Sequence, residues 1–287
     1  MKESIQKASV LIEALPYIRE FEGKTVVIKY GGAAMTDPQL RQDTAKDIAL
    51  MKYVGMNPVV VHGGGPDING YLKRLKVETS FVNGLRVTDD ETIEVVEMVL
   101  AGKVNKDIVR LLNLAGGRAV GLCGKDGDLL FARKVVFEDG ADIGHVGKVT
   151  NVNTNIIRVL CEAGMIPVIA PIATDEEGGT WNINADTAAS EIAGALKAEK
   201  LVFLTDTPGL LRDMDDPDSL INELSYEDAQ ELERQGVIKG GMLPKVEACF
   251  VGLDAGVRRA HIIDGRVPHA LLLEIFTKTG VGTVVKP

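Results

Sequence analysis

The sequence lacks the motifs that most often mark nucleotide-binding and redox proteins. It contains no G-x-x-x-x-G-K-[ST] segment and no G-x-G-x-x-G segment, so we expect neither a Walker loop nor a Rossmann fingerprint. The three cysteines, Cys123, Cys161 and Cys249, are odd in number and lack the spacing of a metal or redox site. We expect them to be buried thiols in a reducing compartment.

Positive charge is also scarce. The 287 residues include 32 lysines and arginines against 41 aspartates and glutamates, and the net charge of −9 argues against nucleic acid or an anionic membrane as a partner. An anionic substrate would therefore need basic side chains gathered at one place. The chain has no signal peptide and no apolar run long enough to span a bilayer, so a cytoplasmic location is expected.

What the chain does contain is an apolar run that ends in a lysine and two glycines. Residues 25–28 read Thr-Val-Val-Ile and lead into Lys29, Tyr30, Gly31 and Gly32. The β-branched run predicts a buried strand, and the glycines let the chain leave it along a path closed to bulkier residues. In open α/β sheets ligands bind at this end of the strands, where a cation beside free N–H groups suits a phosphate. Taken alone, such a lysine is more often a solvated side chain before a turn.

A second stretch of the same kind changes that balance. Residues 58–61 read Pro-Val-Val-Val and lead into His62 and then Gly63, Gly64 and Gly65, with a helical pattern over residues 67–75. Two glycine-rich strand ends in one α/β chain indicate two walls of one anion site. His62 is more typical of a packed strand-end residue than of a catalyst, because no nucleophile pattern accompanies it.

The first residues predict an amphipathic helix over residues 3–20, which Pro16 should kink or restart. Its apolar positions recur at helical spacing and are Ile5, Ala8, Leu11, Ile12, Leu15 and Ile18. Such a stripe either lies on its own domain or stays exposed and pairs with another subunit. The sequence leaves these two possibilities open.

The middle of the chain predicts a helix over residues 43–54 and a hairpin turning at Asn83 and Gly84. Arg86 follows on the returning arm, where it either grips a carboxylate or makes a surface ion pair. Thr88 is expected to cap a helix over residues 89–100, with Glu91 completing a capping box. Residues 124–149 are typical of β-hairpin material at the edge of a domain.

Two charged residues of the second half attract attention. Asp186 follows an asparagine-rich strand end, where it either caps the next helix or projects toward the phosphate site and holds the lysines there. Lys245 lies in the first turns of a helix that opens with Gly240 and Gly241, an electrostatically unfavourable place that favours a nearby anion. Three regions are expected, residues 1–24, 25–195 and 196–287, with the last two sharing one continuous sheet.

Taken together, these motifs resemble the amino acid kinase family, in the family's order and over nearly the whole chain. The motifs are Lys29 with Gly31 and Gly32, His62 with Gly63, Gly64 and Gly65, Asn184 with Asp186, residues 204–209, and residues 240–245. The resemblance implies an α/β fold, an open three-layer αβα sandwich around a mainly parallel central sheet. Within the family, residues 81–89 and 182–186 resemble the members that act on N-acetyl-L-glutamate.

The resemblance implies ATP-dependent phosphorylation of the side-chain carboxylate of N-acetyl-L-glutamate to N-acetylglutamyl 5-phosphate, the second step of arginine synthesis. Both reactants are anions, so catalysis would consist of positioning and charge stabilisation. Lys29 and Lys245 would approach the phosphoryl group from two sides, and Asp186 would orient both. Mg²⁺ would be held by the ATP phosphates and water, without a dedicated metal site.

The same resemblance assigns binding residues. Arg86 would grip the substrate α-carboxylate, and Asn182 would lie near its acetamido group. The other implied residues are Gly64, Gly65 and Asn184 for the acceptor, and Gly31, Gly32, Asp206, Thr207, Pro208, Gly209, Leu210, Leu211, Val237, Ile238 and Lys239 for the nucleotide.

Both ends of the chain resemble the arginine-inhibited members of the family. This implies a homohexamer, a trimer of dimers interlaced through the first helix, with L-arginine as a feedback inhibitor. Arginine would bind between Tyr17 and the C-terminal region, where Glu274 would pair with its guanidinium and His261 and Gly280 would complete the pocket. The alternative is that the helix covers its own domain and Glu274 is a surface acid. Whether a PII-type regulatory protein binds is left open.

Other readings remain at this stage. Kinases for aspartate, glutamate, carbamate and UMP share the lysines and glycines, and the surroundings of Arg86 and Asn182 favour acetylglutamate. A non-catalytic ligand sensor on the same scaffold is expected to have lost Lys29, Asp186 or Lys245, and all three are present.

Overall fold

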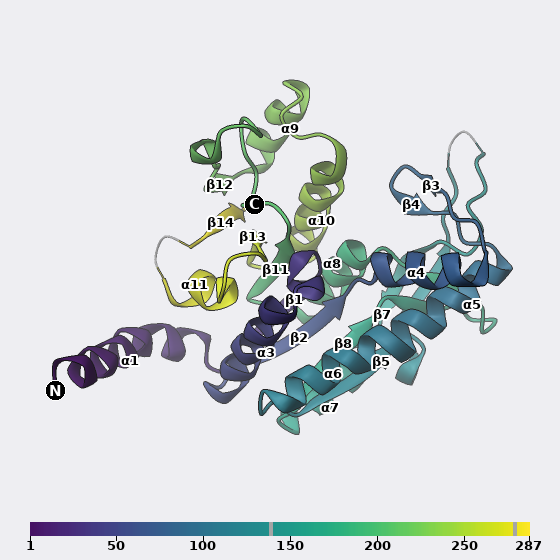
Figure 1. The fold of residues 1–287 in the computed structure, drawn as a ribbon. Helices are drawn as coiled ribbons and strands as arrows, with labels where there is room; N and C mark the ends of the chain where they lie inside the picture. The colour runs from purple at the N-terminus through teal and green to yellow at the C-terminus, as the bar shows by residue number, and fades with distance from the viewer. Residues whose placement is uncertain (138–139, 278–279) are drawn as a thin grey trace.

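The apolar run before Lys29 forms β1 (Thr25–Tyr30), an interior strand of the largest sheet in the computed structural model (Figure 1). The structure describes residues 1–137, 140–277 and 280–287. Among these residues the sheet has eight strands in the order β12-β14-β13-β11-β1-β2-β8-β5, and all neighbours are parallel except β13 and β14. Its other strands are β2 (Asn57–His62), β5 (Ala119–Cys123), β8 (Ile166–Ala170), β11 (Lys200–Thr205), β12 (Glu223–Leu224), β13 (Arg259–Asp264) and β14 (Gly282–Val285).

The strand order reverses at β1, which pairs with β2, its successor in sequence, on one side and with the distant β11 on the other. Such a switch point opens a crevice at the carboxyl ends of the strands. Lys29 and both glycine-rich loops lie at that end. The predicted mainly parallel sheet, continuous through both halves of the chain, is confirmed.

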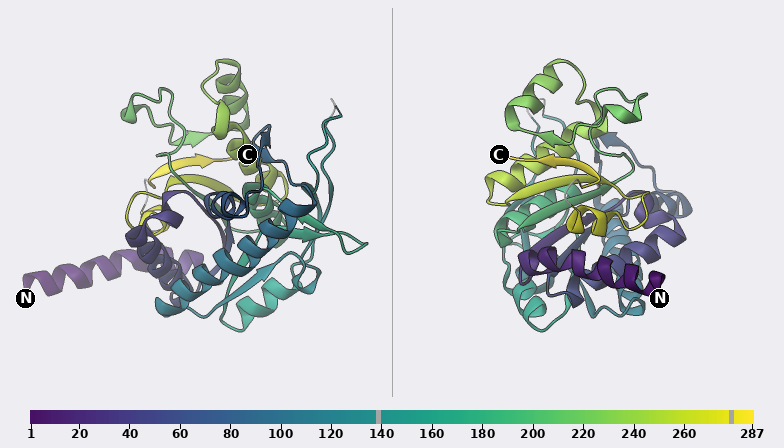
Figure 2. Two further views of the ribbon diagram at one scale, coloured as in Figure 1. Left: turned by 45° about the vertical axis from the view of Figure 1, so that its right-hand side comes forward. Right: turned by 90° about the vertical axis from the view of Figure 1, so that its left-hand side faces the viewer.

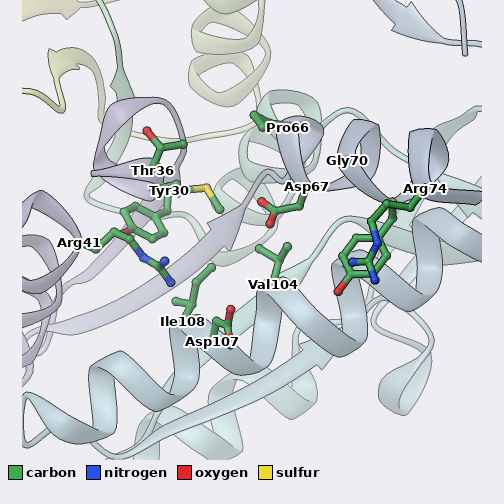
Figure 3. Close-up of a pocket in the computed structure, with 12 residues that line it drawn as sticks. Tyr30, Thr36, Arg41, Pro66, Asp67, Gly70, Arg74, Val104, Asp107 and Ile108 are labelled. Atoms are coloured by element: carbon green, nitrogen blue, oxygen red, sulfur yellow. The ribbon is translucent and has the colours of Figure 1, made fainter. Parts of the chain in front are cut away.

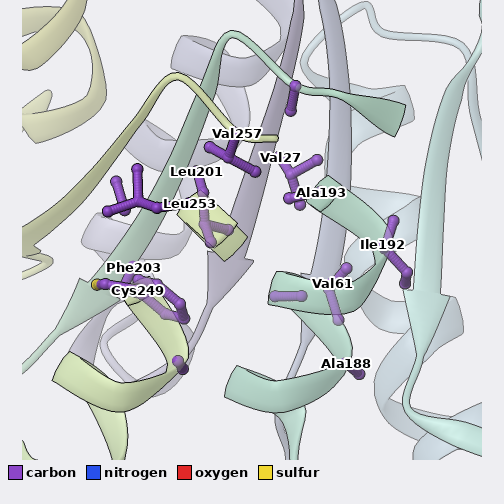
Figure 4. Packing of buried hydrophobic residues seen from close by; sticks show 14 of the residues in the cluster. Val27, Val61, Ala188, Ile192, Ala193, Leu201, Phe203, Cys249, Leu253 and Val257 are labelled. Carbon is purple, nitrogen blue, oxygen red and sulfur yellow. The ribbon is translucent and has the colours of Figure 1, made fainter. Parts of the chain in front are cut away.

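Helices cover both faces of the sheet, which makes the predicted three-layer sandwich (Figures 1 and 2). Alternate side chains of β1 pack into the cores on the two faces of the sheet. Val26 and Ile28 belong to one core, and Val27 belongs to the other. The first core includes α3 (Pro38–Tyr53), α4 (Gly65–Leu75), α5 (Asp90–Glu97), η1 (Met98–Val104), α6 (Asn105–Leu114) and α11 (Ala270–Phe276). The second core includes α7 (Asn155–Glu162), α8 (Ala185–Leu196), α9 (Tyr226–Arg234) and α10 (Leu243–Asp254), and Figure 4 shows its centre.

Smaller elements complete the fold. A second sheet has the order β10-β9-β6-β7, and β3 pairs with β4 in the hairpin predicted at Asn83 and Gly84. Both turn residues have positive φ, as a two-residue hairpin loop requires. The bounds are β3 (Phe81–Val82), β4 (Leu85–Arg86), β6 (Leu130–Lys134), β7 (Gly147–Val152), β9 (Ile172–Thr174), β10 (Thr180–Asn182), α2 (Ala33–Thr36), η2 (Asp126–Asp128), η3 (Pro217–Ser219) and η4 (Gly240–Met242).

The first helix, α1 (Lys2–Phe21), extends away from the sandwich (Figures 1 and 2). Its apolar side chains are exposed, with Leu11 72% and Ile12 68% accessible, whereas Phe21 at its root is buried. The possibility that the helix lies along its own domain is therefore wrong. Pro16 lies inside α1 and does not restart it.

Three local predictions need correction. Asp89, and not Thr88, caps α5 by accepting a hydrogen bond from the Thr92 backbone N–H at 2.8 Å, because Thr88 is buried and donates its hydroxyl to the Arg86 carbonyl. The helix does not end near residue 100, since η1 and α6 continue it to Leu114. Cys161 is only partly buried, unlike Cys123 and Cys249.

None of the helices in the described ranges is long and apolar enough to cross a membrane.

His62 is fully buried at the end of β2, as its strand-end position predicted. Its Nδ1 lies 2.7 Å from the Gly63 carbonyl oxygen, and its Nε2 lies 3.2 Å from the Asn105 amide nitrogen. Burial lowers the pKa of His62 from 6.5 to about 4. The folded protein therefore holds this imidazole neutral.

This burial predicts acid sensitivity. The unfolded chain binds a proton at His62 below about pH 6.5 and the folded chain does not, so stability is complete above that pH and falls as the pH drops toward 4. Between pH 7 and pH 5 we expect His62 to cost about 2 kcal/mol of unfolding free energy. Urea unfolding at both pH values should show that His62→Gln loses less unfolding free energy between pH 7 and pH 5 than the parent protein does, by about 2 kcal/mol. An equal loss in the variant, which keeps the other buried histidine, His261, would contradict this account.

Candidate active site

Lys29 shares the face of β1 that Val27 occupies, and α8 and α10 cover that face. Asp186 lies in the first turn of α8 and Lys245 in the first turn of α10, and both reach Lys29. Asp186 Oδ1 lies 3.0 Å from Lys29 Nζ, and its Oδ2 lies 2.9 Å from Lys245 Nζ. One carboxylate thus bridges the lysines predicted from sequence.

The environment of Asp186 keeps it ionised. Its burial, with 8% of the residue exposed, raises the pKa, but the ammonium groups of Lys29 and Lys245 outweigh burial and bring the pKa below its usual value. The cap of α8 is Asn184, whose side chain accepts hydrogen bonds from the backbone N–H groups of Asp186 and Thr187. Asp186 is therefore free of the capping role that its position also suggested.

A cleft of about 390 Å³ lies between the two glycine-rich loops, and Lys29 lines it. At two glycines there, a larger residue would force a neighbouring side chain to move. A Cβ on Gly32, whose φ is +63°, would lie 2.3 Å from Asp206 Oδ1, and a Cβ on Gly64 would lie 2.5 Å from Leu100 Cδ2. The cleft residues predicted from sequence are Lys29, Gly31, Gly32, Gly64, Gly65 and Asp206.

A second cavity of about 360 Å³ meets this cleft at Lys29, Gly32 and Asp206. Its lining is largely apolar at one side and carries Lys29 and Lys245 at the other. The predicted nucleotide residues that line it are Gly32, Asp206, Thr207, Leu210, Leu211, Val237 and Lys239. Such a lining suits an apolar base attached to an anionic chain.

Some predicted nucleotide residues do not line this cavity. Gly31 lines only the neighbouring cleft, Pro208 and Gly209 lie in the turn behind the cavity, and Ile238 is buried in the core. Five residues line it that the sequence analysis did not assign to the nucleotide, four of them inside the quoted motifs and Met214 outside them: Leu204, Thr205, Met214, Gly241 and Met242. Met214 could have been found as the one apolar residue in the acidic segment 213–218.

Arg86 and Asn182 are brought together through Thr88. The Asn182 amide donates to Thr88 Oγ1 at 3.2 Å, and Thr88 Oγ1 donates to the Arg86 carbonyl at 2.8 Å. The Arg86 guanidinium donates to Asn69 Oδ1 at 2.7 Å and to the Thr79 hydroxyl, and it stacks on the Phe81 ring at 4.7 Å. Arg86 is only 7% exposed and makes no ion pair with a described residue, so it is not the surface side chain considered from sequence.

The residues predicted for arginine gather around α11. Glu274 is 5% exposed, its Oε1 lies 2.7 Å from His261 Nδ1, and its Oε2 accepts from the Val281 N–H at 3.1 Å. A Cβ on Gly280 would lie 2.7 Å from Glu274 Oε2, and the Tyr17 ring meets the ring of Phe276 edge-on at 6.4 Å between ring centroids. Glu274 is therefore no surface acid. Sequence reasoning missed Lys200, whose Nζ lies 3.7 Å from Glu274 Oε1.

A third hollow of about 420 Å³ lies between α3, α4 and α6 (Figure 3). Arg41, Arg74, Asp67 and Asp107 line it, and of these only Asp67 also lines the cleft. It contains none of the residues predicted for catalysis or binding.

Comparison with known proteins agrees with this geometry. The sequence model of the amino acid kinase family matches residues 24–264. The chain belongs to the amino acid kinase family. Acetylglutamate kinase from Heliobacterium modesticaldum, which is 58% identical over 293 residues, aligns with 99% of this chain and 99% of its own length. The family resemblance found in the sequence is thus confirmed.

Two solved structures share the family's fold over nearly all of this chain. N-acetylglutamate synthase from Neisseria gonorrhoeae, complexed with coenzyme A and N-acetyl-glutamate, matches 98% of this chain with a TM-score of 0.84 and 29% identity. The same synthase complexed with coenzyme A and L-arginine matches 97% of it with a TM-score of 0.82 and 27% identity. This chain spans 63% and 65% of those two chains.

The geometry predicts that Lys29 stabilises the transferring phosphoryl group more than it binds the reactants. Lys29→Ala should lower kcat by about 10²–10³-fold with a smaller effect on KM, by analogy with removal of one oxyanion donor. Lys46→Ala is a matched control, because Lys46 is an exposed lysine paired with Asp43 on α3. Steady-state kinetics of ADP release would measure both. A kcat for Lys29→Ala within a few-fold of the parent would remove Lys29 from the mechanism.

Proposed function

We propose that this chain transfers the γ-phosphoryl group of ATP to the side-chain carboxylate of N-acetyl-L-glutamate, in the second step of arginine synthesis. The observation that carries the proposal is the bridge from Lys29 through Asp186 to Lys245, at the junction of the cleft and the apolar cavity. Relatives more than half identical over the full length are acetylglutamate kinases, which supports the choice of acceptor.

The reaction requires little covalent participation by the protein. An acceptor carboxylate is already ionised near neutral pH, so its oxygen attacks phosphorus, the bond to the β–γ bridging oxygen breaks, and ADP leaves, without a general base. Lys29 and Lys245 stabilise charge on the phosphoryl oxygens, and Asp186 holds both ammonium groups in place. The backbone N–H groups of the glycine-rich loops add fixed dipoles.

Mg²⁺ belongs to the same proposal and enters with ATP, bound through its phosphates and water. Asp67 and Asp206 line the cleft and suit a hydrated Mg²⁺, which keeps several of its waters and takes few protein carboxylates. When bound, the ion would neutralise phosphate charge. The reaction would take place in the cytoplasm, where ATP is available.

An ADP-release assay across N-acetyl-L-glutamate, glutamate, aspartate, carbamate and UMP tests the function. N-acetyl-L-glutamate should exceed every other acceptor in kcat/KM. A higher kcat/KM for any other compound would replace the proposed acceptor, and no ADP release with any of them would reject the kinase.

We expect Arg86 to grip the substrate α-carboxylate in the ground state and the transition state alike. Arg86→Lys should then raise the KM for N-acetyl-L-glutamate about tenfold or more and leave that for ATP nearly unchanged, because a lysine cannot make the forked contact. Arg74→Lys is the matched control, since Arg74 also stacks on an aromatic ring, Tyr71, at 4.9 Å. Equal rises in both KM values would contradict this role.

Feedback inhibition by L-arginine is a further part of the proposal. Glu274 is a buried carboxylate that His261 and the Val281 N–H already orient, and Tyr17, near the end of α1, contacts Phe276 at the end of α11. A carboxylate held in this way matches the fork of a guanidinium. The synthase of related fold that was solved with L-arginine supports the idea. Inhibition requires arginine to bind a less active conformation of the protein more tightly than the active one. A ligand with equal affinity for both conformations does not change their populations.

The exposed stripe of α1 supports a hexamer built as a trimer of dimers. Five apolar residues, Ile5, Val10, Leu11, Ile12 and Leu15, are about half exposed or more on a helix that stands away from the sandwich. A second copy of α1, packed against this helix, would remove the exposed apolar surface from water.

Deleting residues 1–20 should therefore leave active dimers with weakened or lost arginine inhibition. A matched variant with Leu11→Glu and Ile12→Glu keeps the helix root at Tyr17 and should also give dimers. Light scattering measures the mass, and ADP release with added L-arginine measures inhibition. Hexamers in either variant, or an intact enzyme that ignores millimolar arginine, would contradict the proposal.

A further inference from the structure

The segment of residues 264–269, between β13 and α11, brings an arginine to the cleft. We call it the 264–269 segment. Arg266 lines the same 390 Å³ cleft as Lys29 and the glycine-rich loops, but it does not line the apolar nucleotide cavity. Its side chain is 51% exposed, so the guanidinium is open to a ligand that enters the cleft.

Arg266 is held by a carboxylate of its own segment. Its Nε donates to Asp264 Oδ1 at 2.9 Å and its Nη2 to Asp264 Oδ2 at 2.8 Å. The backbone N–H of Arg266 also donates to Asp264 Oδ1 at 2.9 Å. No described residue accepts a hydrogen bond from its Nη1, so that edge of the fork is available to another anion.

The segment itself is fastened to the layer that carries the first glycine-rich loop. The Gly265 N–H donates to the Thr205 carbonyl at 2.8 Å, and a Cβ on Gly265 would lie 3.1 Å from the Cβ of Ala34 on α2. At the other end, His269 Nδ1 lies 2.6 Å from Asp47 Oδ1, a buried carboxylate on α3. These contacts hold Arg266 beside the loop that follows β1.

The cleft carries little net positive charge, and Arg266, whose own charge is balanced by Asp264, contributes hydrogen-bond donors there. Lys29 and Lys245 share Asp186, so these three groups together carry one net positive charge. Asp67 and Asp206 add negative charge to the cleft wall. A carboxylate and a nucleoside triphosphate must nevertheless meet there, and the charge that develops lies on the oxygens of the group in transfer.

We propose that Arg266 is a further catalytic residue, which contacts the phosphoryl group while it passes between ATP and the acceptor. The inference rests on the proposed kinase function and deepens it. Arg266 lines the cleft and not the nucleotide cavity, so a ligand group that enters the cleft is the one within reach of its unpaired Nη1 edge. A planar guanidinium suits phosphate oxygens in a way that an ammonium group does not.

The test uses the full-length protein with Arg266→Gln and Arg266→Lys. Arg258→Gln is the matched control, because Arg258 lies in the same half of the chain, is 66% exposed and pairs with one carboxylate, Glu199. The measurements are kcat and both KM values, the thermal midpoint, and the affinities for ADP alone and for ADP with aluminium fluoride and N-acetyl-L-glutamate, a mimic of the transferring group.

Arg266→Gln should lower kcat about 10²-fold, as expected for loss of one charged donor to the transition state. Affinity for the mimic should fall by a similar factor while affinity for ADP stays within about twofold, because ADP lacks the transferring group. Arg266→Lys should recover part of kcat, and Arg258→Gln should match the parent.

Several outcomes would overturn the proposal. They are a kcat for Arg266→Gln within threefold of the parent, equal losses of affinity for ADP and for the mimic, or a loss of kcat that only follows a lower thermal midpoint. If Arg266→Gln does not fold, Arg266→Lys with unchanged kcat and mimic affinity overturns it. Failure of the kinase function is distinguishable, because the parent protein would then release no ADP with N-acetyl-L-glutamate.

Discussion

A buried carboxylate between two lysines is the interaction on which the rest of this structure depends. Asp186 must leave water to reach its place, and burying a charge without partners costs several kcal/mol. Lys29 from β1 and Lys245 from α10 compensate for that cost, so the sheet and both helices must hold their relative positions. Close packing of α8 on α10 maintains them: the Ser190 hydroxyl donates to the Ala248 carbonyl at 2.6 Å, and Gly194 leaves room for Ala255.

Lys29, which this carboxylate holds, lies where two spaces of different chemistry meet. On one side the cavity is apolar enough to take a base, and on the other the cleft is lined by glycine backbone and charge. A reaction between two anions needs such a division, since the protein contributes position and charge and no proton transfer. The buried, neutral His62 at the end of β2 agrees with this, because it contributes to packing beside the cleft without facing it.

Helix α11 touches three functional regions at once. The 264–269 segment before it reaches the cleft, Glu274 within it meets His261 and Lys200 in the interior, and Phe276 at its end meets Tyr17 of α1. Burial lowers the pKa of Lys200 and of His261, whereas His261 brings the pKa of Glu274 below its usual value in spite of burial. A cluster of this kind is sensitive to any added charge, and α11 joins it to the segment that reaches the cleft.

The sequence by itself determined the class of fold and the chemistry of the cleft. Apolar β-branched runs that end in glycines predict buried strands with an anion site at their carboxyl ends, because such runs suit a buried pleated surface and glycine permits the turn that follows. The sequence left open the role of Asp186, the surroundings of Arg86, the burial of Glu274 and the exposure of α1. These depend on which face each residue shares with segments far away in the chain, such as Asp186 with Lys245 or Arg266 with the loop after β1. Only tertiary packing decides such contacts. Strand order and helix placement determine which side chains come within a few ångströms of each other, and local sequence does not.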